Sequence, residues 1–392
     1  MKRIRMLAAA AALMLLALPA FAAEQPLSAL RDWLLAKPDA VLTDPAAADR
    51  NQDGALDARD LTLLKRDAET PGTPAHTVDV NDIEGIFTAM RGAKPGDVIR
   101  IAPGTYDYTK YQGADKIDTK AAGTAEAPVT LTAADPEDPP VLTGSGTAHG
   151  YVLHIQGDYW ILENLKITNA QKGVVFDHSC HSVIRNCEIY QTGAEAVALR
   201  DGSSECTVSH CSIHDTGLVS PGYGEGVYVG SAKSTTGFDY KCDDNKILHC
   251  TFKNIAAEDI DVKEYTTGAE IAYCTFYGDG MTGENYAGSF VDIAGNGCSV
   301  HDNTGYRNNN PKIVAAFEIH EQVEGWGHQN SFCNNTVYMD QPYGVPDPNR
   351  KMYAVDGWFT EITAGGNRAD YGSGLADVPE DYYNVKAVHA PQ

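Results

Sequence analysis

Basic residues are scarce in this sequence, which carries 30 Lys and Arg against 53 Asp and Glu and has a formal net charge of −23. An acidic surface of this kind repels phosphate backbones, so nucleic acid is an unfavourable partner. An acidic polysaccharide is repelled as well unless a cation or a local basic cluster offsets the charge. The simpler explanation, that acidity keeps a secreted protein soluble, stands beside this one.

Long hydrophobic runs are missing after residue 22, so no later segment has the length needed to span a membrane. The early run at residues 6–18 follows the basic start Met-Lys-Arg-Ile-Arg and precedes Ala-Phe-Ala at residues 20–22. A basic start, an apolar run and a small-residue cleavage site are together typical of a secretory signal peptide. We therefore expect residues 1–22 to be a signal peptide and the mature protein to be extracellular.

Paired C-x-x-C spacing is also missing among the nine cysteines, which argues against a structural zinc site. Nine cysteines in an exported protein would ordinarily suggest disulfides. Four of them, followed by two asparagines, instead occupy one position of a repeated pattern: Cys187, Cys211, Cys250, Cys274, Asn303 and Asn335. Side chains stacked at one position point the same way, which is unfavourable for bridging. We interpret the four cysteines as small buried packing residues, and a hydroxyl in their place should lack a hydrogen-bond partner.

The repeated pattern consists of short alternating segments rich in β-branched residues, at residues 183–189, 208–213, 247–252 and 271–276. The step from Cys187 to Cys211 and the step from Cys250 to Cys274 are each 24 residues. A period in the twenties that is carried by strands is typical of a parallel β-solenoid. The longer step between Cys211 and Cys250 indicates an inserted loop, where specificity can be built.

A second strand recurs in each repeat, and its alternation separates inward apolar residues from two outward columns. The first column is His154, Val175, Ala198, Tyr228, Asp261, Asp292 and Glu318. The second column is Gln156, Asp177, Arg200, Gly230, Lys263, Ala294 and His320. Because stacked rungs lie about 4.8 Å apart, the charged residues of the later rungs should form one patch.

Residues 49–60 have the ligand spacing of an EF-hand calcium loop. Side-chain oxygens stand at loop positions 1, 3, 5, 9 and 12, with a backbone carbonyl at position 7: Asp49, Asn51, Asp53, Asp57, Asp60 and Ala55. Gly54 lies where the sharp turn of such a loop requires glycine. A solvated turn rich in Asp and Asn is the simpler alternative. We predict that this loop binds calcium.

Residues 23–70 resemble a dockerin module, in which such a loop is followed by a short helix, here Leu-Thr-Leu-Leu-Lys-Arg at residues 61–66. The resemblance implies a cohesin on a scaffoldin as partner. A complete dockerin has two calcium loops, and this segment supplies one. A Pro- and Gly-containing linker at residues 71–78 then leads to the remainder of the chain, residues 79–392.

This remainder resembles the right-handed parallel β-helix superfamily of pectate lyases and related polysaccharide lyases. The resemblance rests on a helical segment at residues 81–91, the opening Pro-Gly-Asp-x-Ile-x-Ile-x-x-Gly-Thr-Tyr at residues 95–106, and the rungs of the Asn-Cys-Glu-Ile type at 186–189. It implies an all-β solenoid whose open N-terminal end is covered by the helix. Beyond about residue 338 the period fades, and we expect that stretch to close the last rung.

Lyases of this fold commonly use a Lys or Arg on the outward face of a strand as base, next to acidic calcium ligands, and residues 258–264 are similar to such sites. We therefore predict that Lys263, with a lowered pKa, abstracts the C5 proton of a uronate. The predicted calcium ligands are Glu225, Glu258, Asp261 and Asp292. Related enzymes place an Arg one rung after the Lys, where this sequence has Ala294. Arg200 and His320, two rungs away on either side, are the available substitutes.

Three functions are consistent with this pattern. The favoured one is a monomeric, calcium-assisted lyase of an acidic polysaccharide such as pectate. Tyr223, Tyr240 and Trp326 are the expected stacking platforms, and Tyr228 is a further substrate-binding residue. A hydrolase could use two of the outward carboxylates as acid and base, but the Asn-Thr-Asp and Gly-His-Gly strings of the polygalacturonases are missing. The third is a carbohydrate-binding solenoid without activity, since a surface Lys beside acids is often a plain ion pair.

Overall fold

The structure is a computed structural model, and it describes residue 48 and residues 76–339, 351–356, 362–370, 375–377 and 387–389. The chain divides into two compact units, residues 1–75 and 76–392. The predicted signal peptide and calcium loop, with Asp49, Asn51, Asp53, Ala55, Asp57 and Asp60, lie outside the described residues. Among the described residues, no helix combines the length and the apolar character needed to cross a bilayer.

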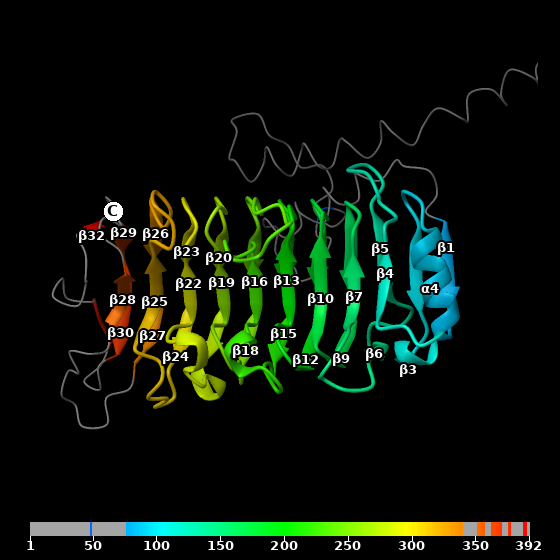
Figure 1. Cartoon of the computed structure of the whole chain (residues 1–392), viewed down its shortest axis with the longest axis horizontal. Coiled ribbons are helices and arrows are strands. Elements are labelled where there is room, and N and C mark those ends of the chain that lie inside the picture. Colours follow the sequence, from blue (N-terminus) through cyan, green and yellow to red (C-terminus); the bar gives the residue numbers. More distant parts are fainter. Residues whose placement is uncertain are drawn as a thin grey trace, which may run out of the picture. The chain divides into compact units, whose positions relative to one another are not determined.

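Residues 76–392 form three sheets of stacked short strands (Figure 1). The twelve-stranded sheet contains β1 (Thr77–Val80), β2 (Val98–Ile101), β5 (Val129–Ala133), β8 (Trp160–Glu163), β11 (Val183–Arg185), β14 (Thr207–Ser209), β17 (Lys246–Leu248), β20 (Glu270–Ala272), β23 (Ser299–His301), β26 (Asn330–Cys333), β29 (Ile362–Gly365) and β32 (Ala387–His389). The eleven-stranded sheet contains β3 (Thr105–Asp107), β6 (Val141–Thr143), β9 (Lys166–Ala170), β12 (Glu188–Thr192), β15 (Ser212–His214), β18 (Thr251–Lys253), β21 (Thr275–Tyr277), β24 (Thr304–Tyr306), β27 (Thr336–Tyr338), β30 (Arg368–Asp370) and β31 (Leu375–Asp377).

The nine-stranded sheet carries the face that matters for function. It contains β4 (Lys116–Thr119), β7 (Tyr151–Ile155), β10 (Lys172–Asp177), β13 (Val197–Arg200), β16 (Val227–Val229), β19 (Ile260–Val262), β22 (Val291–Ile293), β25 (Ala315–His320) and β28 (Lys351–Asp356). Figure 1 shows these strands side by side along the solenoid, with α4 (Ile83–Gly92) at the N-terminal end. Among the described strands, only β30 and β31 pair antiparallel. The predicted parallel β-helix is confirmed.

The first outward column is confirmed by the register of the nine-stranded sheet. Val175 pairs with Ala198, which pairs with Tyr228 on the next rung. Tyr228 pairs with Asp261, and Asp261 pairs with Asp292. Each strand places its alternate residues in the apolar interior, so the polar neighbours of these core residues are forced to the outer face.

The predicted column of cysteines is buried inside the solenoid, and none of the nine cysteines forms a disulfide. Each of the four thiols lies 3.3–3.4 Å from the carbonyl oxygen two residues earlier, as Cys250 Sγ does from Leu248 O at 3.3 Å. The expectation that a hydroxyl here would lack a partner is therefore wrong. Asn303 and Asn335 continue the column, since Asn303 Nδ2 donates to Asn335 Oδ1 at 2.9 Å.

At both ends of the solenoid, strands extend past the points at which the sequence pattern indicated them. At the N-terminal end, α4 begins after Asp82, whose carboxylate accepts from Gly85 N at 2.6 Å, and its buried Phe87 and Met90 cover the core. β1 begins at Thr77, inside the stretch expected to be linker, because it pairs with β2. At the other end, β28, β29 and β30 add to all three sheets beyond residue 340. Asn367 follows Asn335 by 32 residues, the same step as from Asn303 to Asn335, and it continues the column.

Candidate active site

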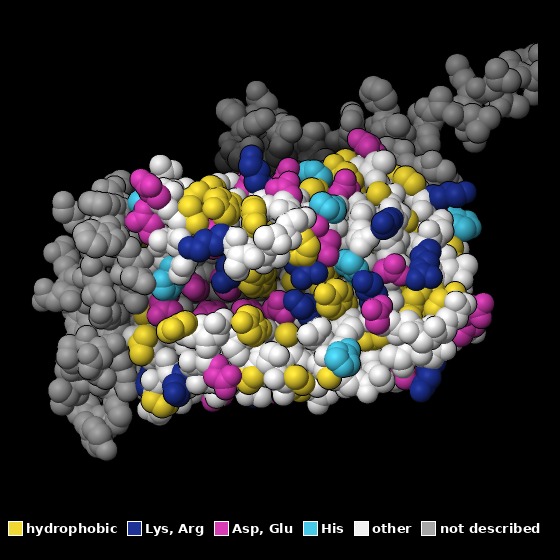
Figure 2. Space-filling model, in the orientation of Figure 1, with side chains coloured by type: hydrophobic (Ala, Val, Ile, Leu, Met, Phe, Trp, Pro, Cys, Tyr) yellow, Lys and Arg dark blue, Asp and Glu magenta, His cyan; other side chains and the backbone are white. Residues whose placement is uncertain are grey.

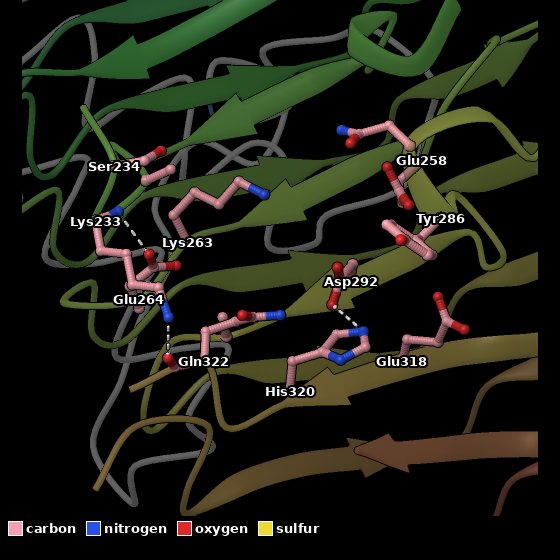
Figure 3. A pocket seen from close by; sticks show the side chains of 13 residues that line it. Lys233, Ser234, Glu258, Lys263, Glu264, Tyr286, Asp292, Glu318, His320 and Gln322 are labelled. Atoms are coloured by element: carbon pink, nitrogen blue, oxygen red, sulfur yellow. Dashed lines mark hydrogen bonds and ion pairs between the residues drawn. The ribbon is translucent and has the colours of Figure 1, made fainter. Parts of the chain in front are cut away.

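A groove of about 820 Å³ lies on the outer face of the nine-stranded sheet, over its later rungs. Figure 2 shows this face hollowed in the middle, with acidic side chains in the hollow and Lys and Arg side chains beside it. The lining includes four residues of the predicted patch, Lys263, Asp292, Glu318 and His320, together with Glu258 (Figure 3). Outward columns on adjacent rungs are what bring these residues together, as the alternation predicted.

Lys263 is held in the groove by a carboxylate on its own strand. Its Nζ lies 2.5 Å from Asp261 Oδ2, and its side chain is 23% exposed. Burial acts to lower the pKa of Lys263, but the charges of Asp261 and Asp292 outweigh it, so the pKa is raised. With only the protein's own charges around it, the expectation of a lowered pKa for Lys263 is therefore wrong. On the preceding rung Gly230 leaves room, because a Cβ there would lie 3.0 Å from Lys263 Cβ.

Tyr228 lies next to Lys263 on the preceding rung. The Lys263 amine is 5.3 Å from the centre of the Tyr228 ring, and the Tyr228 hydroxyl accepts from Ala232 N at 3.1 Å. Burial raises the pKa of Tyr228, followed by the charge of Asp261, so the phenol keeps its proton at neutral pH. A half-buried, protonated phenol beside an amine can act as a proton donor.

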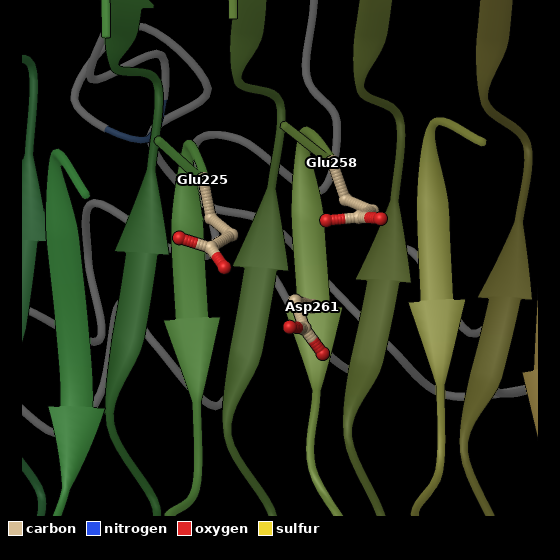
Figure 4. A group of neighbouring side chains, drawn as sticks. All are labelled: Glu225, Glu258 and Asp261. Atoms are coloured by element: carbon tan, nitrogen blue, oxygen red, sulfur yellow. The ribbon is translucent and has the colours of Figure 1, made fainter. Parts of the chain in front are cut away.

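Three buried carboxylates converge beside Lys263. Glu225, Glu258 and Asp261 each offer an oxygen, and these atoms lie within 4.8 Å of one another (Figure 4). The residues are 4%, 7% and 2% exposed, and Glu225 Oε2 has no hydrogen-bond partner among the described residues. Burial, and then the neighbouring carboxylates, raise the pKa of Glu225 and of Glu258. Three buried carboxylates repel one another unless they are protonated or bind a hard cation. Their oxygen donors fit calcium.

A further stack of residues, which the sequence analysis missed, supplies two of these carboxylates. Val174, Val197, Val227 and Ile260 are paired in register, so the residues two positions earlier are stacked as well. These are Lys172, Glu195, Glu225 and Glu258. Lys172 Nζ lies 2.5 Å from Glu195 Oε1 and is the one cation of the four. Period-2 alternation by itself places these four positions on the inner face with Val174 and Ile260, so it did not predict these carboxylates in the groove.

The two predicted substitutes for a neighbouring arginine have different surroundings. His320 lies in the groove, with Nε2 3.3 Å from Asp292 Oδ1. Arg200 instead makes a two-point ion pair with Asp177, at 2.8 and 3.2 Å, and the rung of Gly230 separates it from Lys263. Burial acts to raise the pKa of Asp177, but hydrogen bonds from His154 and Arg200 lower it to about 2. Arg200 is therefore occupied by a structural ion pair.

Inserted loops build the wall of the groove. The turns η2 (Pro221–Tyr223) and η4 (Glu284–Tyr286) are joined by Asn285 Nδ2, which donates to Gly222 O at 2.9 Å. Tyr223 is an exposed ring on the turn bonded to Asn285, and Tyr286, 95% exposed and not foreseen, lines the groove with Asn285. A third turn, η3 (Gly278–Gly280), precedes η4 in the same insertion.

Trp326 belongs to a separate aromatic cluster. Its ring packs edge-on against Tyr265 at 5.4 Å, and Tyr265 packs against Tyr240 at 5.2 Å. None of these three rings is part of the groove lining. Of the predicted substrate-binding rings, Tyr228 lies beside Lys263 and Tyr223 lies on the turn bonded to Asn285, whereas Tyr240 and Trp326 pack within a separate cluster.

Residues 67–301, more than half of the chain, match the family described as Pel9A-like, right handed beta helix region. The chain belongs to this family. An alginate lyase from Paenibacillus sp. str. FPU-7 is similar in sequence and structure, with 39% identity and a TM-score of 0.70 over 75% of this chain and 95% of that chain. The resemblance to the right-handed polysaccharide-lyase solenoids is thereby confirmed for the β-helix.

More distant relatives agree with this assignment. Pectate lyase L from Dickeya chrysanthemi is 26% identical over 129 residues, which are 31% of this chain and 30% of that relative. The chain thus matches less than a third of the length of this relative. The crystal structure of pectate lyase Pel9A aligns at 16% identity with a TM-score of 0.48, over 72% of each chain. The 39% identity to the Paenibacillus alginate lyase, over most of both chains, supports a polysaccharide lyase.

Proposed function

We propose that this protein is a lyase that cleaves a uronate polymer by β-elimination in the groove over β16, β19, β22 and β25. The observation that carries the proposal is the Lys263 amine, which opens to the groove between Asp261 and the Tyr228 ring. Alginate is the polymer we place first, because of the 39% identity to an alginate lyase. Pectate, which the sequence analysis named, comes next.

Elimination requires a base for the C5 proton and an acid for the departing O4 oxygen. We assign the base to Lys263 and the acid to Tyr228, since the two groups are adjacent and Tyr228 stays protonated. The amine must first lose its own proton, which the negative charges of Asp261 and Asp292 oppose. Neutralising these carboxylates would lower the pKa of Lys263 and so prepare it to accept a proton.

We propose calcium as the ion that neutralises the cluster, with Glu225, Glu258 and Asp261 as ligands and Asp292 on the adjacent rung. Their convergence and the unpartnered oxygen of Glu225 fit a hard cation. When bound, calcium would supply positive charge near the substrate carboxylate as that group gains electron density. We place the sugar ring in the groove between Tyr286 and Lys263, which both line it.

The decisive assay is ultraviolet absorbance of unsaturated uronate ends. Purified protein should be incubated with alginate, polygalacturonate, glucuronan and glycosaminoglycans, each with calcium and with chelator. Absorbance that rises with one polymer, faster with calcium than with chelator, supports the proposal. Reducing ends without absorbance would favour a hydrolase, for which Asp261 and Asp292 on adjacent rungs supply the two carboxyls. Binding without any product would indicate a carbohydrate-binding solenoid.

We also propose that the protein is secreted after removal of residues 1–22 and that residues 23–70 bind calcium and a cohesin. These proposals rest on the sequence of the N-terminal segment alone. Recovery from the growth medium of a chain that begins at Ala23 would support secretion. A chain retained inside the cell with Met1 in place would contradict it.

A further inference from the structure

A second cavity, of about 370 Å³, lies on the same nine-stranded sheet at its N-terminal rungs. Its lining residues are Asp115, Lys116, His149, Gly150, Tyr151 and Gln171. We propose that this cavity is a distal subsite that binds a uronate unit of the same polymer chain. The inference rests on the proposed function, because the polymer must be the one that is cleaved at Lys263.

The cavity is built by three consecutive rungs and is held in place by their backbone. Tyr151 N donates to Asp115 O at 3.0 Å, and Gln171 N donates to His149 O at 3.1 Å. Gly150 has a φ of +78°, and a Cβ there would lie 2.3 Å from Asp115 O and 2.4 Å from the Tyr108 hydroxyl. A glycine is therefore needed at this position, and the wall of the cavity exists before any ligand arrives.

The chemistry of the lining suits an acidic sugar. Lys116 Nζ lies 5.5 Å from the centre of the Tyr151 ring, and no carboxylate oxygen of the described residues lies within ion-pair distance of it. An ammonium group without a carboxylate partner is able to bind the carboxylate of a uronate. His149, Gln171 and Asp115 offer donors and acceptors for sugar hydroxyls. The combination of one cation, a ring and a few polar groups is typical of a sugar subsite.

The position of the cavity fits a chain that runs along the sheet. Four rung steps separate β7, which carries Tyr151, from β19, which precedes Lys263. At 4.8 Å per step, the separation along the solenoid is about 19 Å. A 1,4-linked pyranose chain advances by close to one sugar per rung, so the subsite lies at least four sugars from the cleaved bond. The guanidinium of Arg200 lies between these two positions along the sheet. It is 5.7 Å from the centre of the Tyr151 ring and 5.1 Å from the centre of the Phe238 ring.

The subsite also supplies positive charge that can offset the repulsion between the acidic groove and a polyanionic substrate. The carboxylates around Lys263 repel a polyanion, whereas the N-terminal rungs place Lys116, which has no carboxylate partner in the described part of the chain, on the same face. Binding at these rungs would supply affinity that the cleavage site itself does not provide.

The test compares substrate lengths in the Lys116→Ala variant. On tetramers and octamers of the polymer that the wild type cleaves, kcat/KM should fall about fivefold for the octamer and by less than about twofold for the tetramer. Lys116→Arg should restore most of the octamer activity. Lys253→Ala, an exposed lysine on β18 of another sheet, is the matched control and should change neither value. Equal losses on both lengths, or no loss on the octamer, would overturn the subsite.

Failure of the proposed function remains distinguishable from failure of the subsite. If the wild type cleaves no uronate polymer, the lyase proposal fails, and calorimetric binding of uronate octamers then tests the cavity directly. Octamer binding that is weaker in Lys116→Ala than in Lys253→Ala supports the subsite. Equal binding by both variants, or no binding by the wild type, contradicts it.

Discussion

At the scale of single residues, the charge of Lys263 depends on the carboxylates that surround it. Asp261 is in direct contact and Asp292 lies one rung further on, and together they outweigh the effect of burial on the pKa of the amine. A base of this kind is active only when the nearby negative charge is neutralised. The proton on Lys263 and the occupancy of the acidic cluster are thus coupled.

Replacing Lys263 by Ala should reduce kcat by about 10²-fold or more, because general-base catalysis is lost. The melting temperature and substrate affinity should stay close to those of the wild type, since only transition-state stabilisation is removed. The measurement is initial rate by ultraviolet absorbance together with calorimetric binding. Lys253→Ala serves as the control for loss of a lysine. Wild-type kcat in Lys263→Ala would contradict the assignment and favour the paired-carboxylate hydrolase.

Tyr228→Phe tests the proton donor while keeping the ring. We expect kcat to fall about tenfold or more with little change in KM, because the hydroxyl acts only in the transition state. Tyr223→Phe is the matched variant at an exposed tyrosine on the turn bonded to Asn285, and its kcat should be close to that of the wild type. If both variants lose kcat equally, Tyr228 has no special role as an acid.

At the scale of structural elements, the column of cysteines and asparagines connects successive rungs by two different means. The thiols contact carbonyl oxygens weakly, at 3.3 Å or more, and fill space in the core. The asparagines form a hydrogen-bonded ladder, in which Asn335 Nδ2 donates to Val300 O at 2.9 Å and to Asn367 Oδ1 at 3.0 Å. Asn335 Oδ1 accepts from Asn303 N and Nδ2, at 3.1 and 2.9 Å.

Alanine at these two kinds of position should have different effects on stability. Cys250→Ala should lower the free energy of unfolding by about 1 kcal/mol, the loss of a small buried group. Asn335→Ala should lower it by about 2–4 kcal/mol, because several buried backbone and side-chain groups lose their partners. Urea unfolding of both variants measures the difference. Equal losses in the two variants would show that the ladder contributes no more than packing does.

At the same scale, the inserted loops shape the groove, since they lie beside the regularly stacked strands of the nine-stranded sheet. Asn285 links the turn at 221–223 to the turn at 284–286, and these loops come from different rungs. The regular strands fix where the floor residues lie, and the contact between loops decides how deep the groove is.

At the scale of the whole molecule, buried acidity makes stability depend on pH and on cations. Burial raises the pKa of Glu225, Glu258 and Asp292, and neighbouring carboxylates add to the effect. Raised carboxyl pKa values mean that the folded state binds more protons than the unfolded state does. The associated stability is therefore fully present below about pH 4 and is lost as the pH rises through the raised values.

Calcium should compensate for this loss at neutral and higher pH. At a concentration 100 times the dissociation constant it would add about 2.7 kcal/mol of stability. We expect a rise in melting temperature with calcium, relative to chelator, that is larger at pH 8 than at pH 5. Glu258→Gln should reduce both the pH dependence and the response to calcium. A calcium response that is the same at both pH values would contradict a cation in this cluster.

The loop at residues 49–60 must be separated from the solenoid in these measurements. Replacing Asp49 and Asp53 together by Ala should remove one calcium per chain from the calorimetric stoichiometry and leave lyase activity unchanged. The same double variant is the proper background for the melting experiments on Glu258→Gln. An unchanged stoichiometry would show that the loop binds no calcium.

The sequence by itself determined the solenoid, the two outward columns and the buried column of Cys187, Cys211, Cys250 and Cys274. These features follow from alternation within a strand and from repetition between strands, both of which are local patterns. Only the tertiary structure decided which outward residues are covered, as Val175 and Asp261 are, and how the inserted loops meet. It also decided the direction of the pKa of Lys263, because that value depends on burial and on charges from other rungs. The repeat period encodes neither the burial of a side chain nor the charges that other rungs place beside it.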